Sequence, residues 1–244
     1  MRLRLIACNV FQREACHVLA RTPHVVDVVF VDLGEHNRPT VLRERLQAEI
    51  DATATAPHPY DAVLLLFGLC GNAAVGLQAK GAPLIMPRAH DCATVLLGGK
   101  EAFRRQFEAQ PSHAFGNAGY CERGYDYMIS RPAGDAVYTG EYADYVERYG
   151  EEDAKYIWEQ MHPAAADSDE AWYIRVPESD GPGFAARFQQ LAEAAGRTYV
   201  ELSGSLRLIE SLLLGEWPDT DFLRVEPGHE TVGVYDWDTV VKSA

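Results

Sequence analysis

Apolar residues along this chain form two patterns, short continuous runs and longer stretches with helical spacing. The continuous runs are typical of strands that are covered on both faces. They occupy residues 3–7, 24–34, 61–68 and 82–87. The stretches with helical spacing occupy residues 9–19, 40–50, 92–97 and 100–110, and a short helix is also expected shortly after residue 71. This alternation of strands and helices predicts a mostly parallel, doubly wound sheet.

The same alternation returns in the second half of the chain. Strands are expected at residues 171–176, 197–202 and 221–228, helices at 183–196 and 205–217, and an extended segment at 231–237. Between the halves, the sequence of residues 112–131 is irregular, and residues 141–161 are expected to form a charged helix with several aromatic side chains. We therefore expect an N-terminal α/β lobe (1–111), a middle segment (112–170) and a C-terminal α/β lobe (171–244). Two Rossmann-like lobes with a site in the cleft between them fit this division, and one continued sheet is the alternative.

The charge of the chain narrows the classes of partner. Thirty-six acidic residues against 22 basic ones give a formal net charge of −14. This balance argues against binding nucleic acid or anionic membranes, since both require clustered Lys and Arg. No apolar run approaches the roughly 20 residues of a membrane span, and the first residues lack the features of a signal peptide. A cytoplasmic protein acting on a small molecule is the expectation.

Three of the five cysteines stand where a predicted strand ends: Cys8, Cys70 and Cys92. In an open α/β sheet, ligands bind outside the carboxyl ends of the strands. Thiols from three strand ends can therefore meet at one point, although they are far apart in sequence. Convergent thiols are typical of a metal ion, an iron–sulfur cluster or a reactive nucleophile.

Cys70 lies in the segment Gly-Leu-Cys-Gly-Asn, between a strand and the expected short helix. Gly68 and Gly71 let the backbone approach a ligand closely or adopt positive φ, and Asn72 follows them. A position near a helix N-terminus would favour the thiolate of Cys70. Tight packing of a small residue in an ordinary strand–helix turn explains the segment equally well. The spacing matches no nucleotide-binding motif.

The second dense motif is Pro-Arg-Ala-His-Asp-Cys, at residues 87–92. Arg88 suits a carboxylate or phosphate, His90 suits a metal or a proton, and Asp91 suits either a helix cap or acid–base chemistry. The alternative is structural: Asp91 caps the next helix, Arg88 pairs at the surface and Cys92 fills the core. Four such residues beside a second strand-end cysteine favour a functional site.

Two cysteines have less distinct positions. Cys16 falls within the first helix and is interpreted as a small buried residue, whereas Cys121, in the irregular segment, either completes a four-thiol set or lies on the surface. No pair has Cys-x-x-Cys spacing, which argues against a zinc ribbon, a thioredoxin motif or a ferredoxin-type cluster.

The segments ACNVFQREAC, LLFGLCGNAAVGL, PRAHDCATVLLGGKEAF and DFLRVEPG resemble the domain-of-unknown-function family 1638 of bacteria and archaea, over nearly the whole chain. Carried over by position, the residues characteristic of the family are Cys8, Gly68, Cys70, Gly71, Asn72, Arg88, His90, Asp91, Cys92 and Gly98. Members are often encoded near corrinoid-dependent methyltransferases, so the resemblance implies a one-carbon or methyl-transfer setting and a corrinoid or methyltransferase protein as partner. The family has a Gly-Trp stretch where this chain has residues 114–127, with Tyr120 and Cys121.

These observations predict a cysteine-ligated metalloprotein. Cys8, Cys70 and Cys92 are the expected ligands, with Arg88, His90 and Asp91 around an open coordination position. Three thiols without an evident fourth ligand favour a 4Fe–4S cluster over zinc. The alternatives are a zinc–thiolate methyltransferase, an accessory protein that binds a corrinoid protein, and a metal-free thiol enzyme with Cys70 as nucleophile and His90 as base.

Overall fold

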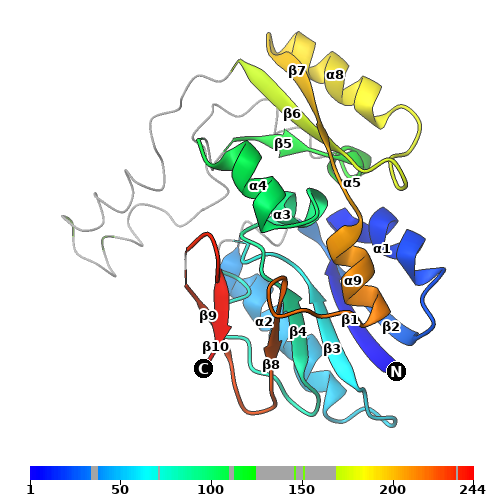
Figure 1. Cartoon of the computed structure of the whole chain (residues 1–244), viewed down its shortest axis with the longest axis vertical. Helices are drawn as coiled ribbons and strands as arrows, with labels where there is room; N and C mark the ends of the chain where they lie inside the picture. The colour runs from blue at the N-terminus through cyan, green and yellow to red at the C-terminus, as the bar shows by residue number, and fades with distance from the viewer. Residues whose placement is uncertain are drawn as a thin grey trace.

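The computed structural model describes residues 1–33, 38–70, 72–109, 113–124, 146, 151, 169–234 and 236–244. Its larger sheet has five strands in the order β2-β1-β3-β4-β8 (Figure 1). These strands are β1 (Arg2–Cys8), β2 (Val25–Val31), β3 (Ala62–Leu66), β4 (Leu84–Pro87) and β8 (Phe222–Val225). The first four run parallel, and β8 pairs antiparallel with β4.

The apolar runs of the sequence form the centre of this sheet. All five residues of β3 are buried, as expected for a strand covered on both faces. Its neighbour β1 pairs with β2 on one side and with β3 on the other, so that Leu5 lies opposite both Val28 and Leu64. These strands share one core with the helices around them.

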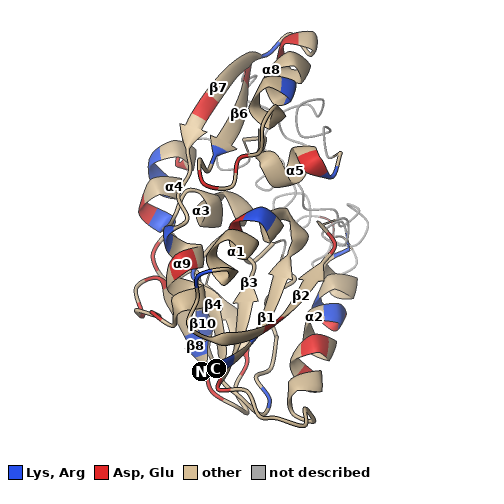
Figure 2. Cartoon of the chain, turned by 90° about the vertical axis from the view of Figure 1, so that its right-hand side faces the viewer, with Lys and Arg blue, Asp and Glu red and all other residues tan. Residues whose placement is uncertain are grey.

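Helices cover both faces of the five-stranded sheet, with α1 and α9 on one face and α2 on the other (Figure 2). The helices of this layer are η1 (Asn9–Phe11), α1 (Gln12–Leu19), α2 (Pro39–Thr53), α3 (Cys92–Leu96), α4 (Lys100–Phe107) and α9 (Arg207–Leu214). α2 buries Leu42, Leu46 and Ile50, which share one face of the helix.

A second, three-stranded parallel sheet lies beyond the carboxyl ends of the first (Figure 1). It contains β5 (Phe115–Gly116), β6 (Glu170–Arg175) and β7 (Thr198–Ser203), with α5 (Ala118–Glu122) and α8 (Phe184–Ala194) packed beside it. The chain then returns to the first sheet as β8 and ends in an antiparallel hairpin of β9 (Thr231–Gly233) and β10 (Val241–Ser243).

The predicted mixed α/β fold with a mainly parallel sheet is confirmed. The helix expected after residue 71 is not found, because residues 72–76 form a turn and none of residues 72–83 is helical. The strand expected within 221–228 is present as β8, so the segment 171–244 contributes strands to both sheets. The domain boundaries remain predictions, and the helix expected at 141–161 lies outside the described residues except at positions 146 and 151. Within the described ranges, no helix is both long enough and apolar enough to cross a bilayer.

Candidate functional site

The order of the parallel strands reverses between β1 and β3. From β1 the chain continues to β2 on one side, and it then returns to β3 on the other side. Such a switch point opens a crevice outside the carboxyl ends of the two strands, where α/β proteins bind ligands. Cys8 is the last residue of β1, and the segment that carries Cys70 follows β3 directly. Two of the three predicted thiols therefore flank the switch point.

The segment after β3, residues 67–77, is called the Cys70 loop below, and it contacts residues 88–92, called the Arg88 loop. Gly68 packs against the backbone of Asp91, where a Cβ would lie 2.6 Å from the Asp91 Cα. The amide of Leu69 donates to the carbonyl of Ala89 (3.0 Å). The next amide, that of Cys70, donates to the carbonyl of His90 (3.4 Å). The two sequence motifs thus form one backbone-paired unit.

Two non-glycine residues of the Cys70 loop have left-handed backbone angles. φ is 46° at Cys70 and 67° at Asn72, whereas Gly71 between them lies outside the described residues. Asn tolerates this region, but a cysteine rarely adopts it. The surrounding hydrogen bonds therefore impose this backbone at Cys70. The absence of a helix after this loop in the described residues removes the expected helix N-terminus beside the thiol.

The five thiols differ in burial. Cys8 and Cys92 are buried, and Cys70 is 9% exposed. Cys16 is exposed on α1, so its interpretation as a buried residue was wrong: that helix buries Glu14, Ala15 and Val18. Cys121 is buried in a cluster with Tyr173 and Phe188 of the second sheet layer. In this conformation Cys121 packs within that layer.

Asp91 is the N-cap of α3, as its structural interpretation predicted. Its Oδ1 accepts hydrogen bonds from the amide (3.0 Å) and the hydroxyl (3.2 Å) of Thr94. Burial raises the pKa of Asp91 to about 6, because desolvation outweighs these bonds. Cys92 is the first residue of the same helix.

The Arg88 side chain donates hydrogen bonds to three backbone carbonyls in the C-terminal part of the sequence. Its Nε donates to the carbonyl of Asp219 (2.8 Å), and its Nη1 donates to the carbonyls of Thr239 (2.9 Å) and Val241. These contacts hold the C-terminal hairpin against the Arg88 loop. Ligand binding by Arg88 would compete with them.

The His90 ring packs among aromatic side chains. Its centroid lies 5.8 Å from that of Phe103 and 5.5 Å from that of Trp237. Burial lowers the pKa of His90 below its ordinary value, because desolvation disfavours the charged ring. Its Nε2 is buried and has no hydrogen-bond partner among the described residues. His90 therefore contacts Cys70 through its backbone, while its ring faces α4 and the C-terminal segment.

The second sheet reaches the same switch point. Asn117 follows β5 and caps α5, since its Oδ1 accepts from the amide of Tyr120 (3.0 Å). Gly119 of that helix packs so closely on η1 that a Cβ would lie 1.9 Å from the carbonyl oxygen of Val10. The residues after β5 thus lie against the residues after Cys8.

Sequence reasoning missed two residues that hold the Cys70 loop. Arg43 of α2 donates from Nη2 to the carbonyl of Asn72 (2.8 Å). The Thr231 hydroxyl donates to the carbonyl of Ala74 (2.7 Å) and accepts from the amide of Leu77 (2.9 Å). Neither residue lies in a recognisable motif, and both act from distant segments, so no local signal identifies them.

The described residues include Cys8, Cys70, Cys92, His90 and Asp91. Among all the described residues, no group of three or more His, Cys, Asp or Glu side chains is arranged to hold a metal ion. The strand ends bring the three cysteines to one edge of the sheet. The predicted three-thiol ligand set is nevertheless not preformed in this conformation.

A protein-family model described as "Protein of unknown function (DUF1638)" matches residues 30–213, which is more than half of the chain. The match includes the Cys70 and Arg88 loops, whereas Cys8 and β8 lie outside it. The resemblance inferred from the sequence motifs is confirmed over these residues. Searches of curated proteins and of solved structures found no match.

Proposed function

The chain belongs to the DUF1638 family, and we propose that the switch point of its five-stranded sheet is a thiol site that binds an iron–sulfur cluster. The observation that carries the proposal is topological. Cys8 and the Cys70 loop flank the crevice where the strand order reverses, and the Arg88 loop, which leads to Cys92, is hydrogen-bonded to the Cys70 loop. Burial of the thiols would shield a bound cluster from solvent.

Cys8, Cys70 and Cys92 would hold the group. Because they do not form a preformed ligand set, loading requires their side chains to turn towards one another. The Cys70 loop is the segment that can respond, since its left-handed backbone is imposed by hydrogen bonds that could rearrange. When bound through three thiolates, a cluster supplies an iron atom with an open position, which acts as a Lewis acid on a small substrate.

We also propose a metabolic context and a protein partner for the site. We place the substrate in one-carbon, methyl-transfer or sulfur metabolism, with a corrinoid or methyltransferase protein as a partner, because the family resemblance implies that context. We also propose that the two sheets are Rossmann-like lobes with the site between them. The contact of Gly119 with Val10 supports this arrangement, because it joins the carboxyl end of β5 to that of β1.

The test is anaerobic purification followed by iron, sulfide and zinc analysis of the wild type, Cys70→Ser and Cys92→Ser. We expect iron and sulfide in the wild type, a brown colour, and loss of both in each variant. Cys16→Ser is the matched control, because Cys16 is exposed on α1. Stoichiometric zinc without sulfide would instead identify a zinc–thiolate site. A wild type that holds neither metal, also after reconstitution with iron and sulfide, would sink the proposal.

A metal-free thiol enzyme is the second candidate, and the lack of a preformed three-ligand group among the described residues favours it. Cys70 would be the nucleophile, since it is the most exposed of the three strand-end thiols. His90 would have to turn its ring away from Phe103 and Trp237 to act as its base. Metal-free protein that loses activity on stoichiometric alkylation of Cys70 would establish this candidate.

A further inference from the structure

Helix α2 holds the segment after Cys70 at two points. Arg43 donates from Nη2 to the carbonyl of Asn72 (2.8 Å). One turn further along the helix, Gln47 binds both backbone groups of Gln78: its Oε1 accepts from the amide (2.8 Å) and its Nε2 donates to the carbonyl (3.1 Å). The first contact lies two residues from Cys70, and the second lies eight residues away.

The contact made by Arg43 falls on a turn with left-handed backbone angles. Asn72 and Cys70 both have left-handed φ values, which an asparagine tolerates but a cysteine rarely adopts. The Asn72 carbonyl also accepts the amide of Val75 (3.2 Å), which closes the turn. A guanidinium donor is charged, so its bond to this carbonyl is stronger than a neutral one. Fixing the carbonyl of Asn72 restricts the backbone that carries Cys70.

We infer that Arg43 is the positioning residue of the Cys70 thiol. Its bond to Asn72 keeps the Cys70 loop in the left-handed turn and keeps the thiol mostly buried. Gln47 anchors the same segment without acting on this turn. The inference does not depend on the proposed function, because it concerns the thiol with or without a bound cluster.

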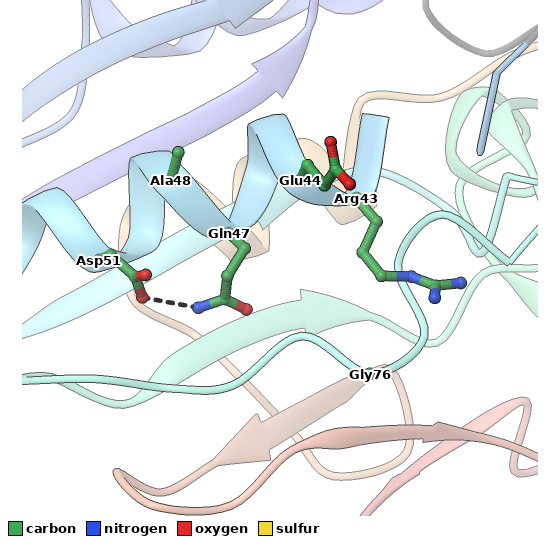
Figure 3. Close-up of a pocket in the computed structure, with 6 residues that line it drawn as sticks. All are labelled: Arg43, Glu44, Gln47, Ala48, Asp51 and Gly76. Atoms are coloured by element: carbon green, nitrogen blue, oxygen red, sulfur yellow. Dashed lines mark hydrogen bonds between the residues drawn. The ribbon is translucent and has the colours of Figure 1, made fainter. Parts of the chain in front are cut away.

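A groove of about 360 Å³ lies beside this contact, and Arg43, Glu44, Gln47, Ala48, Asp51 and Gly76 line it (Figure 3). Glu44 and Asp51 give its wall negative charge, although Asp51 also pairs with Lys80 (3.2 Å). Arg43 itself lines the groove, so removal of its side chain leaves space beside the groove at the former position of the guanidinium. A small planar cation can therefore reach that position once the side chain of Arg43 is removed.

The experiment compares Arg43→Ala with Gln47→Ala, both in a Cys16→Ser background that removes the exposed thiol. Alkylation of Cys70 by iodoacetamide is followed by peptide mass spectrometry, and Tm is measured for each variant. We expect Arg43→Ala to raise the alkylation rate of Cys70 about tenfold or more, as loss of a charged hydrogen bond predicts. Gln47→Ala should lower Tm at least as much but leave this rate within about twofold of the wild type, because its anchor is remote from the turn.

Chemical rescue gives a readout that general destabilisation would not produce. Guanidinium chloride at millimolar concentration, well below denaturing levels, should return the Cys70 rate of Arg43→Ala towards the slow wild-type value. It should have no effect on Gln47→Ala, and methylammonium should rescue neither variant. An unchanged rate in Arg43→Ala, or an equal increase in Gln47→Ala, would overturn the inference. If Arg43→Ala does not fold, Arg43→Lys and Arg43→Gln replace it, and a rate in Arg43→Gln equal to that in Arg43→Lys would count against it.

Discussion

The Cα of Gly68 faces the backbone of Asp91 so closely that a Cβ at position 68 would lie 2.6 Å from the Asp91 Cα. Backbone atoms cannot move aside as a flexible side chain can. Gly68→Ala must therefore separate the Cys70 and Arg88 loops, and we expect it to lower the free energy of unfolding by about 2–3 kcal/mol. Urea unfolding measures this loss, and alkylation of Cys70 should become faster at the same time.

Gly76→Ala is the control for that substitution. Gly76 also lies in the Cys70 loop, with φ of +79°, but a Cβ there would meet no atom within 4 Å. Its cost should be limited to about 1 kcal/mol for an alanine in the left-handed region. Equal losses in the two variants would mean that loop contact is not what requires glycine at position 68.

Asp91 should make stability depend on pH. Its pKa is raised by burial to about 6 from an ordinary value near 3.8, so the folded state binds the proton more tightly than the unfolded state. The stabilisation from this proton is complete below pH 3.8 and is lost as the pH rises to about 6. Asp91→Asn keeps an acceptor for Thr94 but cannot titrate. The stability of the wild type relative to this variant should therefore fall between pH 4 and pH 6, by at most about 3 kcal/mol. Urea unfolding at intervals of one pH unit tests this, and parallel curves would contradict it.

Arg88 should stabilise the C-terminal hairpin. Arg88→Met removes the donors to the carbonyls of Asp219, Thr239 and Val241, which lie on segments more than 130 residues away. We expect a loss of about 2–3 kcal/mol, because a charged donor to the partly buried carbonyls of Thr239 and Val241 is removed. Hydrogen exchange should become faster in β9 and β10 first. Unchanged exchange there, together with loss of substrate binding, would instead assign Arg88 to a ligand.

The hydroxyl of Thr231 should stabilise the packing of the Cys70 loop on β9. Thr231→Val keeps the shape of the side chain but removes the hydroxyl that bonds Ala74 and Leu77. The expected loss is about 2 kcal/mol, since both backbone groups are then buried without that partner. Thr231→Ser keeps the hydroxyl and should retain most of the stability. If serine and valine cost the same, the lost methyl contacts would explain the effect rather than the hydrogen bonds.

Sequence reasoning predicted the strands better than their arrangement. The apolar run at 61–68 identified β3 because complete burial requires a continuous run. The strand within 221–228 was also predicted, but its partner strand was not. A pattern of buried residues does not show which strand a segment pairs with or in which direction. β8 pairs antiparallel with β4, and the residues of the second sheet lie between these two strands in the sequence. The helix expected after Gly71 was wrong because hydrogen bonds from Arg43 and Thr231 fix those residues as a turn.

The sequence indicated where in the fold the candidate site lies, but not which contacts its side chains make. The sequence indicated that Cys8 and Cys70 lie near strand ends, and the strand order of the structure puts these two strand ends on either side of the switch point. The direction in which a side chain points depends on tertiary contacts. Arg88 binds the C-terminal hairpin and the His90 ring packs on Phe103, which no local pattern indicates.

The antiparallel strand β8 also affects how the protein is made on the ribosome. Its partner β4 ends at Pro87, whereas β8 begins at Phe222, so the five-stranded sheet closes only after the whole segment between them and β8 itself have left the exit tunnel. Until then β4 is an unprotected edge, able to pair with another nascent chain. Contacts of such long sequence separation also slow folding. Truncated chains that end before residue 222 should therefore aggregate during synthesis, and the last step of folding should coincide with docking of the C-terminal hairpin onto Arg88.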